Sequence, residues 1–411
     1  MPRVLILAFV LLALLPACSF DRDEPKAASS TTQATIELGE PVELKMAWLE
    51  ERQVHEPQFL LDDGGALLLA WREHSEAGSD LYMARRGEDG QFGTAIRVND
   101  EPATVASYPH DEMRVALAAG PNGLIGVGWS DSRGQVRAAV SSDGAATFAP
   151  SVRLEQTDVA AYRGFPAIAF DASGVLHAVW IDARYAEGMA EEPADLYYAT
   201  IVDGVVTESN LTAEQEATVC GCCRTYIEVT EEGVTRALFR NGADGYRDIF
   251  TVSSPPAGGA GMEAGMSAPK LIGQPLWKLN GCPMSGPIAV GDRVLWSDGS
   301  SGRKLLMVAP FGSEPASPLF SPSFSEEQQD GWMPRLSPRA VSTNQPGSPL
   351  LLLPGQASSR LVSAAAGGKE WRIEADDLPP WATSAFYENG SLLLIGSVNG
   401  EFQLAQRRVD L

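Results

Sequence analysis

The sequence is poor in basic residues, and no hydrophobic run in it is long enough to cross a membrane. Lys and Arg number 31 among 411 residues, against 53 Asp and Glu, so the formal net charge is −22. A chain of that sign repels phosphate backbones, which argues against a nucleic acid as partner. The longest apolar run, Val4 to Leu15, has 12 residues, whereas a membrane-spanning helix needs about 20. These two shortages exclude nucleic-acid-binding and multi-span membrane proteins.

Amphipathic helices are also lacking, whereas turn-forming residues are abundant. After the N-terminal run we find no convincing helical periodicity over ten or more residues. Gly numbers 40 and Pro 28, beside 44% apolar residues, a combination typical of a turn-rich globular protein and not of a disordered or collagen-like one. The length permits two or three domains, or one large all-β domain.

The N-terminus has the pattern of an export signal. Arg3 precedes the apolar run, which has the length of a signal peptide core. The run ends in Leu15-Pro16-Ala17-Cys18, which resembles the lipobox of bacterial lipoproteins, and that resemblance implies lipidation of Cys18. The alternative is a plain secretory signal with a chance cysteine. Ser19, which is not Asp, favours the outer membrane where the organism has one.

We therefore predict a signal peptide over 1–17, a polar tether over 18–40 and a single domain over 41–411. The expected location is the cell envelope, with the lipid bilayer as a partner through the acyl chains.

One unit recurs along the domain: a turn with Gly next to a polar residue, then an apolar strand that closes on a large aromatic residue. The closing residues of the five clearest copies are Trp71, Trp129, Trp180, Phe239 and Trp296, which lie 58, 51, 59 and 57 residues apart. Weaker copies close on Leu353 and Gly396. Each copy reads as four short strands, for example around 58–61, 67–71, 81–85 and 95–99 in the first.

A twisted four-stranded sheet cannot bury both of its faces alone, so such units must stack, and radial closure achieves this with short edges. We predict an all-β fold, a β-propeller of four-stranded blades. Seven blades are favoured and six are the alternative, because the last two copies are weak. The strand expected at 35–45 would complete the last blade beside the one at 403–409.

The segment Ser141-Ser142-Asp143-Gly144-Ala145-Ala146-Thr147-Phe148 resembles the Asp box of sialidase-like (BNR-repeat) propellers, in which it is structural. It departs from that motif at Ala145, where the family has Gly. Around Cys220 to Thr225 and Gly281-Cys282-Pro283 the sequence resembles secreted bacterial proteins described as sialidase-like. These resemblances imply a sialidase-like propeller and leave the activity open.

Four cysteines remain beyond Cys18, namely Cys220, Cys222, Cys223 and Cys282. An even number in an oxidising compartment predicts disulfides, with three possible pairings. A bridge from Cys222 or Cys223 to Cys282 would close a loop of about 60 residues and contribute about 4 kcal/mol. The alternative is a thiolate metal site or redox site, with His55 or His110 as further ligands. We expect disulfides, no metal and no cofactor.

Residues just before each inner strand line one mouth of a propeller channel, and here they are rich in charged and aromatic types. They are His55-Glu56-Pro57, Tyr108-Pro109-His110-Asp111, Tyr162-Arg163-Gly164-Phe165-Pro166, Cys223-Arg224-Thr225, Pro283-Met284-Ser285 and Trp332-Met333-Pro334-Arg335. We take His55, Tyr108, His110 and Trp332 as binding candidates. The alternative for each residue is that it caps a blade and bonds loop amides.

Sialidase chemistry requires three arginines that clamp a carboxylate, a tyrosine activated by a glutamate, and an acidic residue. Arg163, Arg224 and Arg335 lie at suitable strand starts, and Glu56, Asp111 and Tyr162 or Tyr226 could supply the other groups. Two segments, Trp129 to Arg133 and Trp180 to Arg184, share W-x-D-x-R, in which we expect Asp and Arg to pair and fix the next loop.

Three hypotheses follow. The favoured one is a lipid-anchored propeller that binds a glycan, a peptide or an envelope protein at the channel mouth without hydrolysing it. The second is a glycoside hydrolase of the sialidase type. The third is a metal or redox role for the cysteines.

Overall fold

The computed structural model describes residues 53–107, 115–187, 193–213, 218–256, 265–273, 277–301, 305–312, 315–319, 337–343, 349–364, 371–409 and 411. Contacts divide the chain into 1–37 and 38–411, and every described residue belongs to the second unit. The predicted signal peptide, Cys18 and the tether therefore lie outside the described residues. No helix in the described part of the chain combines the length and the hydropathy that a membrane span needs.

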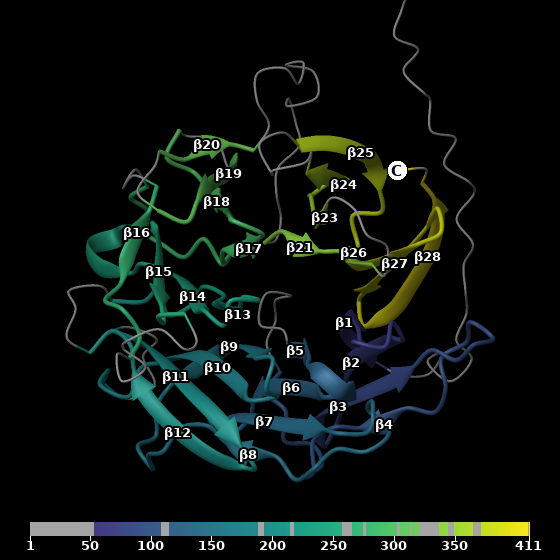
Figure 1. Cartoon of the computed structure of the whole chain (residues 1–411), viewed down its shortest axis with the longest axis horizontal. Coiled ribbons are helices and arrows are strands. Elements are labelled where there is room, and N and C mark those ends of the chain that lie inside the picture. The colour runs from purple at the N-terminus through teal and green to yellow at the C-terminus, as the bar shows by residue number, and fades with distance from the viewer. Residues whose placement is uncertain are drawn as a thin grey trace, which may run out of the picture. The chain divides into compact units, whose positions relative to one another are not determined.

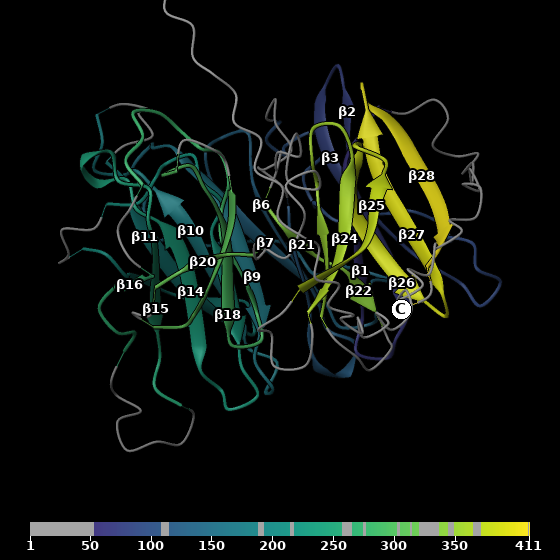
Figure 2. The same cartoon turned by 90° about the horizontal axis from the view of Figure 1, so that it is seen from above.

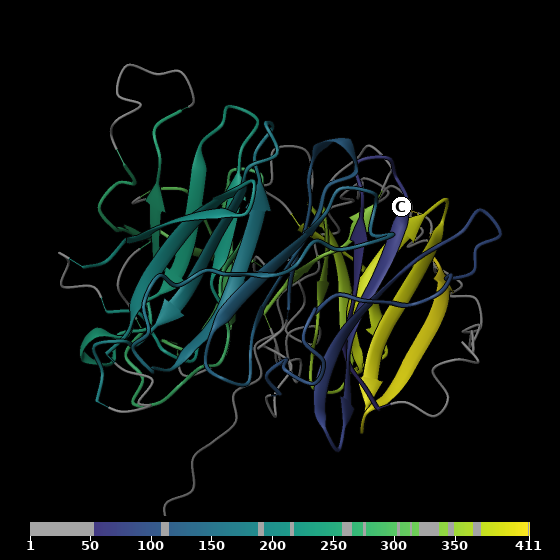
Figure 3. The ribbon, with the colours of Figure 1, turned by 90° about the horizontal axis from the view of Figure 1, so that it is seen from below.

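The described chain is almost entirely β-structure, in seven sheets of four strands each. Figure 1 shows the sheets following one another around a ring, with β1, β5, β9, β13, β17 and β21 toward its middle. Figures 2 and 3, turned by 90°, show long strands such as β10 and β27 running steeply across the thickness of the ring. The predicted seven-bladed propeller is confirmed, and six blades is wrong.

The first four blades comprise β1 (Gln53–Leu61), β2 (Leu67–Ser75), β3 (Gly78–Arg85) and β4 (Ile96–Arg97); β5 (Ala116–Ala119), β6 (Ile125–Ser130), β7 (Val136–Ser141) and β8 (Val152–Arg153); β9 (Arg163–Phe170), β10 (Leu176–Asp182), β11 (Asp195–Val202) and β12 (Val205–Asn210); and β13 (Tyr226–Val229), β14 (Thr235–Arg240), β15 (Ile249–Ser253) and β16 (Lys270–Ile272). The last three comprise β17 (Ile288–Val290), β18 (Arg293–Asp298), β19 (Leu305–Pro310) and β20 (Ser317–Pro318); β21 (Arg339–Ala340), β23 (Leu350–Leu353), β24 (Ser359–Ala364) and β25 (Trp371–Leu378); and β22 (Ser342–Thr343), β26 (Ala382–Glu388), β27 (Ser391–Val398) and β28 (Glu401–Arg408). Two 3₁₀ turns, η1 (Pro121–Gly123) and η2 (Ala243–Gly245), complete the described elements.

The repeated aromatic residues hold neighbouring blades together. Each of the five second strands carries one of them, and each is at most 4% exposed: Trp71, Trp129, Trp180, Phe239 and Trp296. Trp180 shows the arrangement, because it packs in one cluster with Ala116 and Val136 of the preceding blade. Second strands such as β6 and β10 are buried on both faces, as expected for a sheet covered by a blade on each side. The sequence period is therefore the period of the blades.

The turn that opens each repeat requires a left-handed backbone. At Gly174, between β9 and β10, φ is +86°, a conformation that costs glycine little and other residues much. A Cβ atom there would also approach Leu124 Cδ1 to 2.9 Å. The glycine of this turn is thus set by both the backbone and the neighbouring blade.

Side-chain packing closes the ring between its first and last blades. Val54, Phe59 and Trp71 form one buried cluster with Phe386 and Ile395. Two hydrogen bonds cross the same junction: Val54 N–H donates to Gly400 O at 2.7 Å, and Phe59 N–H donates to Ser384 Oγ at 3.0 Å. Blades 1 and 7 are therefore in direct contact.

The last blade differs from the other six. Its innermost strand, β22, runs parallel to β26, whereas the strands of the other sheets pair antiparallel. In the other blades the first turn joins the inner strand to the second strand. The turn at 389–390 joins β26 to β27 in the same way, so β26 corresponds to the inner strand of the other blades. The outer edge of β28 pairs with no described strand. The strand expected at 35–45 lies outside the described residues, and its addition to this edge stays a prediction.

The turn after β7 has the internal hydrogen bonds expected from its sequence. Thr147 donates to Asp143 from its backbone N–H at 2.9 Å and from its hydroxyl at 2.6 Å, and Ser141 Oγ donates at 2.7 Å. The bonds from Thr147 lower the pKa of Asp143 to about 2. Ala145, where the resemblance expects Gly, has φ +70°, so this position does require the left-handed region.

We predict that Phe59→Ala lowers the free energy of unfolding by about 3–5 kcal/mol, the usual cost of removing a buried aromatic ring. Phe59 is 6% exposed and lies at the junction of blades 1 and 7. Urea unfolding followed by tryptophan fluorescence measures the change. Val205→Ala, at a side chain that is 67% exposed, is the control and should change it by less than about 0.5 kcal/mol. Equal effects of the two variants would contradict closure by packing.

Candidate functional site

The predicted mouth lies where the inner strands begin, and the structure describes part of it. His55, Glu56, Tyr162, Arg163 and Arg224 are within the described residues. Tyr108, His110, Asp111, Trp332 and Arg335 lie outside them, so their predicted roles are unchanged. His55, Tyr162 and Arg224 are half-buried, whereas Glu56 and Arg163 are buried.

Three blades have a non-glycine residue in the left-handed region at this mouth. Glu56 in blade 1, Phe165 in blade 3 and Met284 before blade 5 have φ of 54°, 53° and 49°. The pairing of β1 with β2 and of β9 with β10 is irregular at the first two of these places. Such conformations cost about 1–3 kcal/mol each and cluster at functional sites as well as in tight turns, and bulges re-aim side chains near such sites. The repeated irregularity therefore indicates the mouth as a site.

Glu56 forms a buried ion pair. Its Oε1 lies 2.9 Å from Arg72 Nη2, and the two side chains are 5% and 3% exposed. Arg72 also donates to the hydroxyls of Ser79 and Ser107 at 3.2 and 2.9 Å. This carboxylate is held by a cation on the adjacent strand, so its buried charge is compensated.

Arg163 donates its hydrogen bonds within the protein. Nε donates to Asp182 Oδ2 at 2.7 Å, and the two Nη atoms donate to Gly134 O and Val159 O at 3.0 and 2.8 Å. Its side chain is 3% exposed and that of Asp182 is 0% exposed. These contacts fix the start of β9, which is the role that the capping interpretation gives it. Its role in a carboxylate clamp stays a prediction.

The predicted pairing within W-x-D-x-R is confirmed. Arg133 and Arg184 form ion pairs with Asp131 and Asp182 at 2.7 and 2.6 Å. The same position fixes the next loop in two further blades, where Asn241 and Asp298 stand two residues after the aromatic. In all four blades this side chain accepts from the N–H two residues later: Arg133 at 2.8 Å, Arg184 at 2.9 Å, Ala243 at 3.0 Å and Ser300 at 2.8 Å. The loop-fixing roles of Asn241 and Asp298 were not predicted from the sequence, although each is an acidic or amide residue at a fixed offset from the aromatic.

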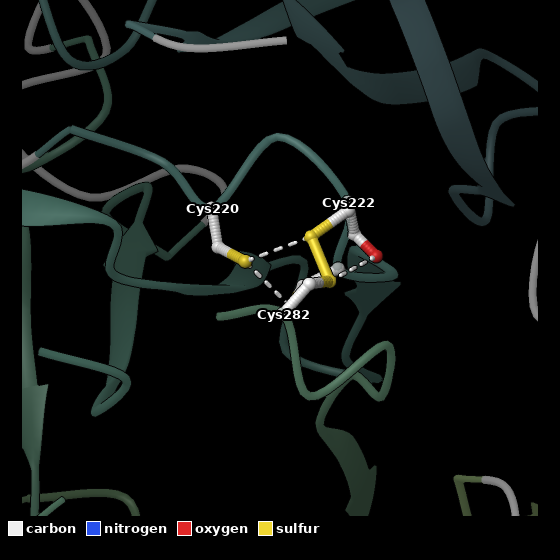
Figure 4. A group of neighbouring side chains, drawn as sticks. Cys220, Cys222 and Cys282 are labelled. Atoms are coloured by element: carbon white, nitrogen blue, oxygen red, sulfur yellow. Dashed lines mark hydrogen bonds between the residues drawn. A yellow bond between two sulfur atoms is a disulfide. The ribbon is translucent and has the colours of Figure 1, made fainter. Parts of the chain in front are cut away.

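The four cysteines gather between blades 4 and 5, at the mouth. Cys222 and Cys282 form a disulfide with Cα atoms 6.4 Å apart and a sequence separation of 60, which is normal bridge spacing. The sequence predicted a bridge to Cys282 from either Cys222 or Cys223, and Cys222 forms it. Figure 4 shows Cys220 directed toward this disulfide, with its Sγ 3.6 Å from Cys222 Sγ.

The second expected bridge is absent from the described structure. Cys220 and Cys223 are buried free thiols whose Sγ atoms lie 2.7 Å apart and share a hydrogen bond. A turn brings them together, because Cys223 N–H donates to Cys220 O at 3.2 Å. The structure leaves Cys220 and Cys223 unbridged, and a second disulfide stays a prediction. The sequence signal that was missed is the C-x-x-C spacing of Cys220 and Cys223.

The two thiols differ in acidity. The hydrogen bond from Cys223 lowers the pKa of Cys220, and this effect outweighs burial. Burial raises the pKa of Cys223 well above the usual thiol value. Proton sharing in this pair thus favours Cys220 as the thiolate.

Two buried arginines supply positive charge to the same region. Arg240 is 0% exposed and donates to Ser285 O and Ser297 O of blade 5, at 3.0 Å each. Arg247 donates to Gly281 O at 3.0 Å, next to Cys282. Both arginines contribute to the lowered pKa of Cys220. They hold the two cysteine-bearing loops together and make their surroundings electropositive.

A metal ion is the other ligand that clustered cysteines suggest. The four Sγ atoms lie within 4.8 Å of one another, and thiolates suit zinc or copper. However, a metal needs free thiolates, and Cys222 and Cys282 are bonded to each other. The arrangement found among the described residues is a disulfide beside two thiols.

A cleft of about 240 Å³ lies elsewhere, between blades 1 and 7. Gly90, Phe92 and Asn389 line it, beside the ion pair of Arg86 with Glu388 at 3.4 Å. These residues lie at the end of the ring opposite the mouth, where the inner strands end. The cleft therefore does not include the predicted site residues.

Solved structures similar to this chain are propellers of varied activity. A Dyadobacter fermentans protein of unknown function aligns with 12% identity over 90% of this chain and 98% of its own, with a TM-score of 0.46. A Mycobacterium tuberculosis puromycin-hydrolyzing peptidase aligns with 12% identity over 88% of this chain and 53% of its own, with a TM-score of 0.52. A Hadza microbial sialidase aligns with 12% identity over 83% and 76%, with a TM-score of 0.43.

No family model and no curated protein matches the sequence. Among the three, the peptidase alone has a TM-score above 0.5, and at 12% identity its similarity to this chain shows the fold alone. The chain also spans only about half the length of the peptidase. The chain is thus a β-propeller by its own seven sheets, and a sialidase is among its structural neighbours.

We predict that Asp182→Ala lowers the free energy of unfolding by about 3–5 kcal/mol, because it removes the buried partner of Arg163 and Arg184. Thermal and urea unfolding of the purified chain measure the loss. Asp158→Ala is the matched control, since Asp158 pairs with Arg153 at 2.9 Å but its side chain is 100% exposed; we expect a change below about 0.5 kcal/mol. A tolerated Asp182→Ala would show that the contacts of Arg163 are not structural.

Proposed function

We propose that this protein is a binding propeller, which recognises a glycan, a peptide or an envelope protein at the mouth formed by the inner-strand starts. The observation that carries the proposal is the left-handed backbone at Glu56, Phe165 and Met284, repeated at this mouth in three blades. Loops on a rigid scaffold are where propellers present binding residues.

Arg224 is the described cation best suited to contact such a ligand. It is half-buried, it stands directly after Cys223, and it precedes β13. Arg163 and Arg240 are buried and donate to backbone carbonyls within the protein. Arg224 is less buried than these two, and a guanidinium forms directed hydrogen bonds with carboxylates and carbonyl groups.

A sialidase-type hydrolase is the second candidate, and one contact favours it. Tyr226, two residues after Arg224, donates a hydrogen bond from its hydroxyl to Glu228 Oε2 at 3.2 Å. A tyrosine with a glutamate partner is the pair that sialidase chemistry needs. Burial raises the pKa of Tyr226, and Glu228 adds to the increase, so the phenol stays protonated at neutral pH. The pair lacks the acidity of an activated nucleophile.

We further propose that an acyl anchor on Cys18 holds the domain at the cell envelope. The lipobox-like segment before Cys18 supports this. We expect the full-length chain, expressed in a Gram-negative host, to fractionate with membranes, and Cys18→Ala to move it to the soluble fraction. Intact mass of the N-terminal peptide checks the modification. An unmodified Cys18, or membrane association that survives the substitution, would contradict the anchor.

We predict that Arg224→Ala weakens ligand binding at least about tenfold, which corresponds to about 1.4 kcal/mol. The labelled full-length chain is first screened on glycan and peptide arrays, and the affinity for hits is then measured by titration. Arg372→Ala is the control, because Arg372 is exposed on the outer strand β25, and it should bind as the wild type does.

A fluorogenic sialoside separates the two candidates. We expect no turnover by the purified chain. Turnover that disappears in Arg163→Ala and Arg224→Ala, with both variants folded, would overturn the binding proposal in favour of the hydrolase. Absence of any glycan or peptide binding, or equal binding by Arg224→Ala and wild type, would also contradict it.

A further inference from the structure

We propose that the cysteine cluster is a thiol–disulfide exchange site, in which Cys220 is the nucleophile and the Cys222–Cys282 disulfide is its partner. The site would take thiol–disulfide couples as substrates, entering through Cys282. The proposal does not rest on ligand binding at the mouth. The proposal rests on the position of a thiol beside a disulfide, on the charge around it and on the exposure of one sulfur.

Cys220 lies next to the disulfide that it would attack. Cys220 Sγ lies 3.6 Å from Cys222 Sγ and 2.7 Å from Cys223 Sγ. Exchange proceeds by attack of a thiolate on a disulfide sulfur, so a thiol in contact with a disulfide is already in position for it. The turn from Cys220 to Cys223 and the bond from Cys220 N–H to Arg240 O, 2.9 Å long, fix the main chain at this place.

The surroundings of Cys220 are electropositive. Arg240 and Arg247 are buried beside the cluster, and both donate to main-chain carbonyls. Their charges favour a thiolate at Cys220, as does the hydrogen bond from Cys223. A cysteine that only fills a core has no need of such surroundings, whereas reactive cysteines lie in electropositive ones.

The leaving sulfur of the exchange belongs to Cys282, which external reagents can reach. Cys282 is exposed, Cys222 is half-buried, and Cys220 and Cys223 are buried. The N–H of Met284 donates to Cys282 Sγ at 3.3 Å, which would stabilise negative charge on that sulfur. The sulfur released by attack on Cys222 is thus the one that external reagents reach.

The exchange balances without an added oxidant or reductant. The Cys220 thiolate attacks Cys222 Sγ; the bond between these two sulfurs forms, the bond from Cys222 to Cys282 breaks, and its electron pair leaves on Cys282. Cys223 then loses its proton, by way of water, to the Cys282 thiolate and attacks Cys220 Sγ. The bond between Cys220 and Cys223 forms, and Cys222 leaves as a thiolate. One disulfide and two thiols are present before and after.

The products are a buried disulfide within the C-x-x-C turn and an open pair at Cys222 and Cys282. In this form the exposed Cys282 thiol, once it has given its proton to the Cys222 thiolate, can attack the disulfide of a small molecule or of another protein. In the starting form the Cys222–Cys282 disulfide can instead be attacked by an external thiol. Two-electron equivalents then pass between an external thiol–disulfide couple and the buried pair of Cys220 and Cys223.

Trapping with N-ethylmaleimide tests the proposal without any reductant. The folded full-length chain is incubated with the reagent, digested under non-reducing conditions and mapped by mass spectrometry. We expect Cys282 to acquire the maleimide over time, while a new disulfide links Cys220 to Cys223. In Cys220→Ala the labelling of Cys282 should be at least about tenfold slower, because the attacking thiol is absent.

Cys223→Ala is the matched control, since it removes the other buried thiol and keeps the nucleophile. Cys282 should still be labelled in it, with a disulfide between Cys220 and Cys222. Melting temperatures of both variants, measured first, set the conditions under which each is folded. Equal labelling of Cys282 in wild type and Cys220→Ala, no labelling of Cys282 in the wild type, or a chain isolated with bound metal and no disulfide would each overturn the proposal.

Discussion

Burial of both faces of each sheet is the constraint on which the rest of the structure depends. A four-stranded sheet with an apolar strand such as β10 cannot stand alone in water, and only a neighbouring blade on each side covers it. Large aromatic side chains on the second strands are buried in these layers. Because every blade needs two neighbours, the row of sheets must close, and the cluster around Phe59 and Phe386 closes it.

The same constraint creates the mouth. Packing the blades side by side brings the starts of the inner strands to one end of the ring, together with the loops that follow the second strands. Those loops are tied down by buried polar groups: Asp131, Asp182, Asn241 and Asp298 each bond the main chain two residues on. Buried arginines such as Arg240 then join one blade to the next through carbonyls. A rigid frame of this kind can hold Arg224 and the cysteines in fixed positions.

The fold was largely predictable from the sequence, because it follows from a pattern repeated along the chain. Trp71 to Trp296 mark the period directly, and the number of blades follows from counting copies. The site was less predictable, because each side chain there depends on contacts made across blades. Arg163 has the sequence position of a ligand-binding cation, yet its partner Asp182 and the carbonyl of Gly134 use its donors. A bridge to Cys282 from either Cys222 or Cys223 was expected from the order of the blades, whereas only the structure shows which of the two forms it.

The amide of Val54 is the most direct probe of the account, since its hydrogen bond to Gly400 O spans the junction of blades 1 and 7. Native-state hydrogen exchange of this amide, compared with that of Val179 in the buried strand β10, measures how the ring opens. If packing alone closes the ring, Val54 exchanges only on global unfolding, with the same free energy as Val179. Exchange of Val54 at a much lower free energy would show that the junction opens by itself, and the converging mouth would lose its structural basis.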